Sequence, residues 1–309
     1  SAPWKNALTV WSLVSGWRRI RTIARDQRTR LAVATGGYAA GATIVWAAAS
    51  RTPLVLQEAN SFAGQTTRLG SRYAREIYLG FPEAVHSFPL GARSRCVDTG
   101  NPIERPPARE SRMPREAARS KWGFPATGAP VVLVFGGSQG SVALNDLVAG
   151  WLTSANGDPA RPYVIWATGK DLYPRYAQHA SKYVAVVPYL SPISDAYAAT
   201  DVALTRAGAM TTAELCAWAI PAVLVPLPTA AADHQTANAK ALEAAGAALR
   251  VDQKSTTAQA LGDTVMSLVC DETLRLSVAR HALERARPDA ADTIARRILT
   301  ILTSSNLSR

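Results

Sequence analysis

The chain has 309 residues, which is enough for two domains of ordinary size, and 48% of them are hydrophobic, as in ordinary globular proteins. No run of about 18 uncharged apolar residues is present, and no cleavable signal peptide is recognisable, so we expect no membrane-spanning helix. The net charge is +11, and residues 1–105 supply most of it, with 14 Lys and Arg against 6 Asp and Glu.

The basic first third of the chain indicates a negatively charged partner. Nucleic acid and an anionic membrane leaflet both fit this charge. Because no RNA- or DNA-binding motif is present, we favour the membrane. The three cysteines, Cys96, Cys216 and Cys270, are widely spaced, which is typical of free thiols in a reducing compartment and predicts neither disulfides nor a metal site.

The first predicted element is an amphipathic helix over residues 6–25. Its apolar residues recur every three or four positions, at Val10, Val14, Trp17, Ile20 and Ala24. A neighbouring stripe consists of Trp4, Leu8 and Trp11 and runs into Arg18 and Arg25. Tryptophan beside arginine is typical of a helix on a membrane surface. The alternative is that the tryptophans belong to the core and the arginines face water.

Polar or glycine-rich loops follow the predicted strands of the first domain. A strand at residues 31–34 leads into Thr35-Gly36-Gly37-Tyr38, whose N–H groups can face an anion, although a plain tight turn fits equally. A strand at 54–56 leads into Gln57-Glu58-Ala59-Asn60, for which an ordinary helix cap is the alternative to a binding role. After a third strand at 77–79, the proline-rich segment 100–107 is typical of a linker between domains.

The second domain begins with an apolar strand at residues 131–135 and the loop Gly136-Gly137-Ser138-Gln139-Gly140-Ser141, followed by a helix. A strand followed by a glycine loop and a helix N-terminus directs N–H groups toward one point, so this segment is expected to bind an anion. The loop is not a dinucleotide fingerprint, because Ser138 replaces the second glycine, and it lacks the Gly-Lys-Ser/Thr ending of a P-loop. Strands at 164–166, 184–187 and 202–204 alternate with helices, which predicts a parallel, doubly wound sheet.

The most informative stretch runs from Arg206 to Asn238. It begins with a small glycine-centred loop, after which hydroxyls and the carboxylate of Glu214 follow in the opening turns of a helix, a place to hold a phosphate and a ribose. A buried strand at 222–226 then leads to Asp233-His234-Gln235. Because ligands of open α/β sheets bind at the carboxyl ends of the strands, both loops are candidates for one site. A last amphipathic helix is predicted over 292–302.

Together these motifs resemble, in order and near in spacing, those of the MurG family, the transferases that add N-acetylglucosamine to lipid I in peptidoglycan synthesis. The segments that carry the resemblance are Thr35–Tyr38 with Gly41, Gln57–Asn60 with Gly64, Thr99–Pro102, Gly136–Ser141 and Arg206–Asn238. Two positions depart from the family pattern. Gln57 stands where the family has histidine, and Glu104 stands where it has arginine, with Arg105 displaced by one position.

The resemblance implies two Rossmann-like α/β domains with parallel, doubly wound sheets around a cleft, the GT-B arrangement. It implies an acceptor- and membrane-facing domain at 1–103, a UDP-sugar-binding domain at 104–287 and a helix at 288–309 that returns to the first domain. The family's first glycine loop, whose histidine is the usual proposal for the general base, has no counterpart in this sequence. The first domain is therefore expected to be incomplete, and the catalytic residue is left unassigned.

By the same resemblance, one set of residues is expected to bind the UDP-sugar and another to face the acceptor. The donor set is Asn60, Ser138, Leu190, Ala209, Met210, Thr211, Thr212, Ala213, Glu214 and Gln235, with Arg105 as a further candidate. The acceptor set is Gly36, Gly37, Tyr38 and Glu58. His234 is expected to bind or to be structural. No cofactor is expected and, because no Asp-x-Asp pair occurs, no metal.

The implied reaction is inverting transfer of N-acetylglucosamine from UDP-N-acetylglucosamine to the muramoyl 4-hydroxyl of lipid I, an undecaprenyl-linked acceptor, which forms lipid II. The implied location is peripheral, on the cytoplasmic face of the bacterial plasma membrane, and no nucleic acid partner is expected. Three alternatives stay open. They are a non-catalytic UDP-sugar-binding remnant, another GT-B lipid glycosyltransferase and a UDP-sugar epimerase.

Overall fold

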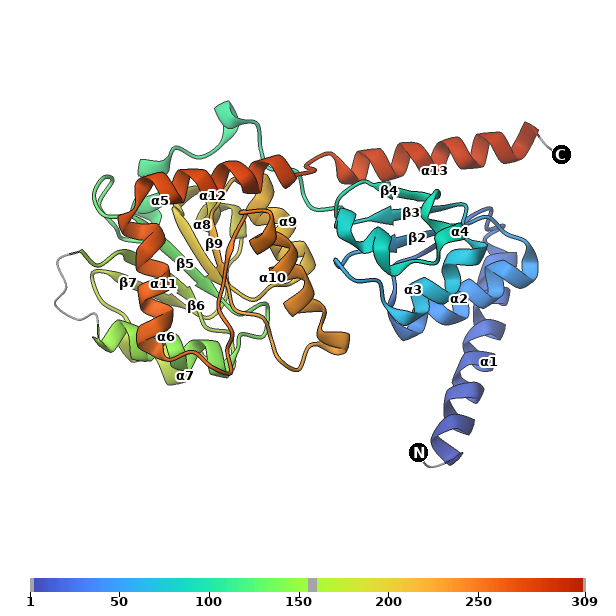
Figure 1. Cartoon of the computed structure of the whole chain (residues 1–309), viewed down its shortest axis with the longest axis horizontal. Coiled ribbons are helices and arrows are strands. Elements are labelled where there is room, and N and C mark those ends of the chain that lie inside the picture. Colours follow the sequence, from blue (N-terminus) through green and yellow to red (C-terminus); the bar gives the residue numbers. More distant parts are fainter. Residues whose placement is uncertain (1–2, 155–159, 308–309) are drawn as a thin grey trace. The chain divides into compact units, whose positions relative to one another are not determined.

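The computed structural model describes residues 3–154 and 160–307, which fall into two compact units (Figure 1). Unit 1 consists of Ser1–Pro102 and Asp289–Arg309, and unit 2 consists of Ile103–Pro288. Each unit is built on one parallel sheet, which confirms the predicted α/β fold class. Within the described ranges, no helix has both the length and the apolar character needed to cross a bilayer.

Unit 1 is built on a four-stranded parallel sheet in the order β1-β2-β3-β4. Its strands are β1 (Ala32–Ala34), β2 (Leu54–Glu58), β3 (Glu76–Leu79) and β4 (Cys96–Asp98). Its α-helices are α1 (Pro3–Asp26), α2 (Gly37–Ser50), α3 (Gln65–Gly70), α4 (Leu90–Arg93) and α13 (Ala290–Leu307). β2 is buried along its whole length, as expected of an interior strand of a parallel sheet.

Helices α1 and α2 supply much of the apolar cover of this sheet. Ala40, Ile44 and Ala47, spaced four and three positions apart on α2, are buried in the core of unit 1. From α1, Trp17 and Ile20 pack against the same core. The part of this stripe from Trp17 to Ala24 is therefore a core face, which agrees with the second interpretation for Trp17.

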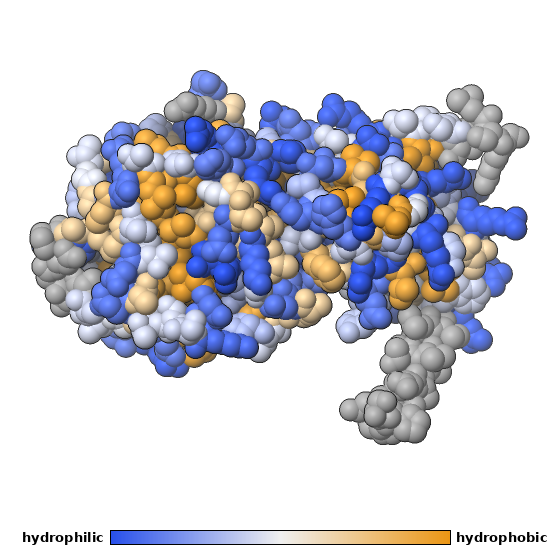
Figure 2. All heavy atoms as spheres, in the orientation of Figure 1, coloured by the Kyte–Doolittle hydropathy of each residue, from blue (hydrophilic) through white to orange (hydrophobic). Residues whose placement is uncertain are grey.

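The neighbouring stripe of α1 stays a prediction. The side chains of Trp4, Leu8 and Trp11 lie outside the residues whose side chains the structure describes. Farther along the helix, Arg18 and Arg25 are exposed. Elsewhere, the visible surface of each unit carries hydrophobic residues interspersed with hydrophilic ones (Figure 2).

Helix α13, from the end of the chain, is tied to unit 1 by a bidentate ion pair. Arg297 donates through Nε to Glu76 Oε2 and through Nη2 to Glu76 Oε1, both at 2.7 Å. These hydrogen bonds raise the pKa of Arg297. Because Glu76 opens β3, the pair joins the last helix to the third strand of the sheet.

Unit 2 is built on a six-stranded parallel sheet in the order β10-β9-β8-β5-β6-β7. Its strands are β5 (Val131–Phe135), β6 (Tyr163–Ala167), β7 (Val184–Val187), β8 (Val202–Thr205), β9 (Ala222–Leu224) and β10 (Leu249–Arg250). Its α-helices are α5 (Arg115–Lys121), α6 (Val142–Ser154), α7 (Tyr173–Tyr176), α8 (Ile193–Ala199), α9 (Ala209–Ala217), α10 (His234–Ala244), α11 (Ala258–Cys270) and α12 (Glu272–Arg285). The chain runs outward from β5 through β6 to β7, then returns to β8 on the other side of β5. The strand order therefore reverses between β5 and β8.

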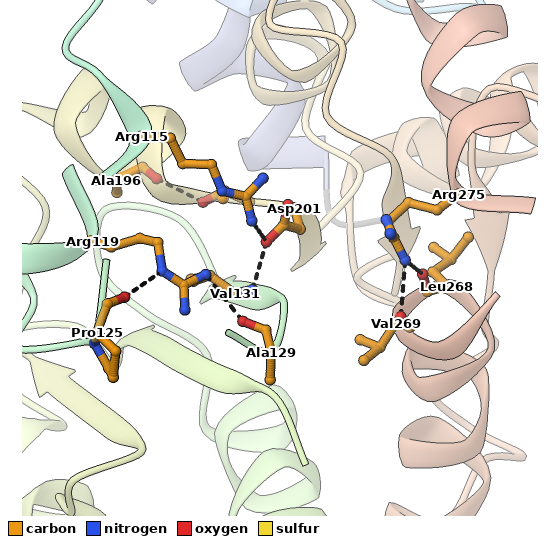
Figure 3. A network of polar contacts seen from close by, with 11 residues as sticks. Arg115, Arg119, Pro125, Ala129, Val131, Ala196, Asp201, Leu268, Val269 and Arg275 are labelled. Carbon is orange, nitrogen blue, oxygen red and sulfur yellow. Dashed lines mark hydrogen bonds and ion pairs between the residues drawn. The ribbon is translucent and has the colours of Figure 1, made fainter. Parts of the chain in front are cut away.

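The amino ends of β5 and β8 are joined by side-chain as well as main-chain bonds (Figure 3). Asp201 N donates to Val131 O at 2.9 Å, and Val131 N donates to Asp201 Oδ2 at 2.7 Å. Arg115 pairs with the same carboxylate. Beside them, buried Arg119 donates to two carbonyls of the segment that precedes β5, at 2.7 and 3.0 Å. These bonds fix where the two central strands begin.

The loop after β5 packs against the loop after β6 without room for side chains. A Cβ on Gly140 would lie 1.9 Å from Thr168 O, and one on Gly169 would lie 2.3 Å from Gln139 O. Both glycines also have left-handed backbone angles, with φ of +75° and +95°. Only glycine fits both demands, so the two loops present one continuous backbone surface at this edge of the sheet.

We expect alanine at Gly140 to destabilise the protein more than alanine at Gly137. Gly137 has φ of +97°, but nothing lies within 4 Å of its Cβ position, so Gly137→Ala adds only backbone strain of roughly 1–2 kcal/mol. Gly140→Ala adds the same strain and also forces the backbone of Thr168 to move. Urea unfolding midpoints of the two variants test this, and equal midpoints would contradict the packing described above.

Candidate functional site

A cavity of about 470 Å³ opens in unit 2 at the carboxyl ends of β5, β6 and β7. Phe135 and Ala167 end β5 and β6, Pro188 follows β7, and the opening turns of α8 and α9 complete the wall. The lining residues are Glu104, Phe135, Gly137, Ser138, Ala167, Gly169, Pro188, Tyr189, Leu190, Ser191, Pro192, Ile193, Ser194, Thr211 and Glu214. The cavity therefore adjoins the reversal of strand order, where open α/β sheets bind their ligands.

The start of α9 offers hydrogen-bond donors to a negatively charged group. The helix begins at Ala209 after Gly208, and helical geometry supplies no acceptor for the N–H groups of Met210 and Thr211 in its first turn. Thr212 Oγ1 donates to the carbonyls of Gly208 and Ala209, at 3.0 and 3.1 Å, so its hydroxyl is engaged by its own helix. Thr211 instead lines the cavity. The helix dipole adds to this preference for an anion.

Arg206 places a buried positive charge behind these loops. It is only 5% exposed, and it donates to Ser141 Oγ at 2.6 Å, Gln253 Oε1 at 2.5 Å and Val225 O at 2.9 Å. All of these acceptors are neutral, and burial lowers the pKa of Arg206 to about 10. A buried cation held by neutral oxygens leaves a positive potential, which an anionic ligand near the loop Gly136–Ser141 would offset.

Glu214 is one of the two carboxylates of the cavity wall, and Glu104 is the other. Glu214 Oε2 accepts a hydrogen bond from Tyr197 OH at 2.7 Å. No other hydrogen bond of this carboxylate exists among the described residues, so Oε1 remains available to a ligand that donates hydroxyl groups. The described part of the chain contains no cluster of three or more His, Cys, Asp or Glu that would hold a metal ion.

The structure brings together part of the predicted donor set. Ser138, Leu190, Thr211 and Glu214 all line the cavity, although they come from three segments far apart in the sequence. The remaining members on α9 are Ala209, Met210, Thr212 and Ala213, which occupy the same two turns. A ligand in the cavity can therefore contact both the glycine loop and the start of α9.

Two other predicted donor residues lie outside the cavity wall. Gln235 Oε1 accepts from Leu227 N at 2.9 Å, so this oxygen holds its own loop in place. Glu104 lines the cavity and the displaced Arg105 does not. A donor role for Gln235 and Arg105 stays a prediction.

The residues predicted to face an acceptor lie in unit 1, as does Asn60. Gly36 precedes α2 and Gly37 opens it, with φ of +87° and +74°, and Tyr38 is 96% exposed. Glu58 is 4% exposed, and its carboxylate accepts from Asn60 N at 3.1 Å and from Gly64 N at 3.1 Å. The structure thus gives Glu58 a role in holding its own loop, and contact with an acceptor stays a prediction.

Two residues that shape this site carry little signal in the sequence. Arg206 follows an apolar strand directly, a weak signal for a buried polar role. No sequence pattern connects Tyr197 with Glu214, because the two residues are 17 positions apart and lie on different helices.

Comparison with known proteins relates both parts of the chain to one family. Residues 1–79 match the Glycosyltransferase family 28 N-terminal domain, and residues 131–294 match the corresponding C-terminal domain. The chain is 40% identical over 293 residues to the UDP-N-acetylglucosamine--N-acetylmuramyl-(pentapeptide) pyrophosphoryl-undecaprenol N-acetylglucosamine transferase of Salinibacter ruber, covering 94% of this chain and 75% of that protein. It is also 40% identical over 290 residues to the protein of the same name from Halorhodospira halophila, covering 90% and 76%.

Solved structures agree with this relation. The crystal structure of Acinetobacter baumannii MurG superposes with a TM-score of 0.73 at 27% identity and covers 97% of this chain and 81% of that chain. The S. aureus MnaA structure with UDP superposes with a TM-score of 0.72 at 11% identity over 96% of this chain and 82% of that chain, which shows a shared fold alone.

Two cysteines allow a test of how tightly the helix of the site is packed. Cys216 on α9 is buried, which raises its pKa to about 11, whereas Cys270 at the end of α11 is exposed. At pH 8 the Cys216 thiol is protonated and covered, so we expect a thiol reagent to modify Cys270 rapidly and Cys216 only when α9 opens. Peptide mass spectrometry would identify the modified cysteine, with Cys270→Ser as the control. Rapid modification of native Cys216 would contradict the burial of α9.

Proposed function

The chain belongs to the MurG family of glycosyltransferases, and from this membership we propose that it transfers N-acetylglucosamine from UDP-N-acetylglucosamine to lipid I, forming lipid II. The observation that carries the proposal is the cavity at the start of α9, where a carboxylate, a glycine loop and a helix N-terminus meet. A nucleoside diphosphate offers the matching groups, which are two ribose hydroxyls and a negatively charged diphosphate.

We assign the donor groups to the cavity as follows. Glu214 Oε1 accepts from the ribose, and the segment 188–194 contacts the uracil. The diphosphate lies between the N–H groups at the start of α9 and the loop Gly136–Ser141. The buried charge of Arg206 and the dipole of α9 support this placement, because both favour an anion at this edge of the sheet.

The transfer step is a displacement at C1 of the sugar. The 4-hydroxyl oxygen of the acceptor forms a bond to C1 while the bond from C1 to the diphosphate oxygen breaks on the opposite face. The electron pair of that bond goes to UDP, and the hydroxyl proton goes to a general base, to which we assign no residue. Helix α9 and Arg206 favour the reaction by stabilising the charge that develops on the leaving diphosphate.

We further propose that the acceptor is polyprenyl-linked and that the enzyme binds peripherally to the cytoplasmic face of the plasma membrane through unit 1. The uneven charge supports this, since residues 1–105 hold 14 Lys and Arg against 6 Asp and Glu. Basic residues attract an anionic leaflet by about 1 kcal/mol each when they lie near its surface.

The proposal is tested by calorimetry of UDP-N-acetylglucosamine binding without metal, with UDP-glucose and NAD as competitors, followed by a turnover assay with lipid I. Selective binding and formation of lipid II are the expected results. Binding without turnover would favour a UDP-sugar-binding protein, and 2-epimerisation of the free nucleotide sugar would favour an epimerase. Absence of binding would overturn the donor site.

Removal of the Glu214 carboxylate should weaken donor binding. Glu214→Ala deletes a charged acceptor of ribose hydroxyls, so we expect the binding of UDP-N-acetylglucosamine to become weaker by about 1.5–3 kcal/mol. Glu243→Ala is the matched control, because Glu243 pairs with Arg250 at 2.8 Å and does not line the cavity. The same dissociation constant for Glu214→Ala and the unchanged chain would refute the ribose contact.

A further inference from the structure

The hydrogen bond between Tyr197 and Glu214 connects two helices at the cavity wall. Tyr197 lies on α8 and is 3% exposed, and its hydroxyl donates to Glu214 Oε2 at 2.7 Å. Its ring packs against Trp218, with 5.6 Å between the ring centroids. A buried ring between two elements has little freedom to move, so the hydroxyl offers the carboxylate a fixed donor.

The bond has two physical consequences for Glu214. A glutamate side chain that is free to rotate loses conformational entropy when a ligand immobilises it, and a carboxylate already held in one conformation avoids much of that loss. The bond also occupies one oxygen and leaves the other for the ligand. Burial and the charge of Glu214 both raise the pKa of Tyr197, so its hydroxyl keeps its proton and remains a donor.

We propose that Tyr197 is a positioning residue for nucleotide recognition, which holds Glu214 so that Oε1 meets the ribose hydroxyls. The inference rests on the proposed function, because it requires that the cavity bind a ribonucleotide. Tyr197 itself does not contact the ligand. It strengthens the selection of ribose over sugars that lack the hydroxyls, because a site with a preformed acceptor binds poorly to a ligand that leaves the acceptor unpaired.

The chain contains a matched control for this pair. Tyr176 is 2% exposed and donates to Asp146 Oδ1, also at 2.7 Å, and its ring packs against Trp166 with 5.3 Å between centroids. Neither Tyr176 nor Asp146 lines the cavity. Tyr176→Phe therefore removes a tyrosine–carboxylate bond of the same length from the same unit, away from the nucleotide site, although Asp146 is more exposed and also pairs with Arg175.

The experiment compares UDP with 2′,3′-dideoxy-UDP, which lacks both ribose hydroxyls, by calorimetry on the full chain. For Tyr197→Phe we expect roughly five- to tenfold weaker binding of UDP and unchanged binding of the dideoxy nucleotide. For Tyr176→Phe we expect both affinities to be unchanged. In a Glu214→Ala background, which removes the acceptor that Tyr197 holds, the further change Tyr197→Phe should have little effect.

Several outcomes would overturn the inference. Unchanged UDP binding by Tyr197→Phe would show that Glu214 needs no support, and an equal loss for both nucleotides would show a general structural role for Tyr197. Additive losses in the double variant would mean that Tyr197 acts independently of Glu214. If the unchanged chain does not prefer UDP to the dideoxy nucleotide, the ribose site itself fails, and the proposed function loses its donor assignment together with this inference.

Discussion

The pairing of β5 with β8 is the constraint on which unit 2 depends. The two strands are parallel neighbours although 66 residues separate Phe135 from Val202 at their nearest ends. Their amino ends are fixed by the bonds between Val131 and Asp201, so their carboxyl ends meet at one edge. The loops that follow them carry a glycine turn and a helix N-terminus, and the pairing brings both to one place. A shift of either strand would separate these two groups.

Electrostatics gives that edge its preference for anions. Arg206 follows β8 and is buried among neutral oxygens, so among the described residues its hydrogen bonds include no carboxylate partner. Burial of such a charge is unfavourable for the folded state, as the lowered pKa of the guanidinium indicates. In the proposed donor site, stability and function are therefore opposed at this residue, because the charge that is unfavourable in the free protein would stabilise a bound diphosphate.

Glutamates in the two units show that one residue type can have different roles. Glu58 is buried, and both of its oxygens accept from its own loop, so it stabilises a turn. Glu214 accepts from Tyr197 through one oxygen, and its other oxygen has no hydrogen bond among the described residues. Glu76 pairs with Arg297 and ties the last helix to the first sheet. In each case the neighbouring donors, and not the carboxylate itself, determine the role.

Sequence patterns predicted most of the regular structure. The apolar run at residues 131–135 is β5 with the predicted bounds, because an interior parallel strand must be apolar at every position. The pattern did not predict β4 or β10, whose two or three residues are mostly half-buried and carry no continuous apolar signal. The strand expected at 222–226 is shorter, since Pro226 cannot donate to a neighbouring strand.

By itself, the sequence determined the alternation of strands and helices, the glycine loops and the family to which they belong, because these depend on local composition and on motif order. Only the tertiary structure decided the neighbours of each side chain. It showed that Glu104 and not Arg105 reaches the cavity, that Gln235 bonds Leu227, and that Tyr197 holds Glu214. Such contacts join elements that are distant along the chain, and packing geometry alone selects them.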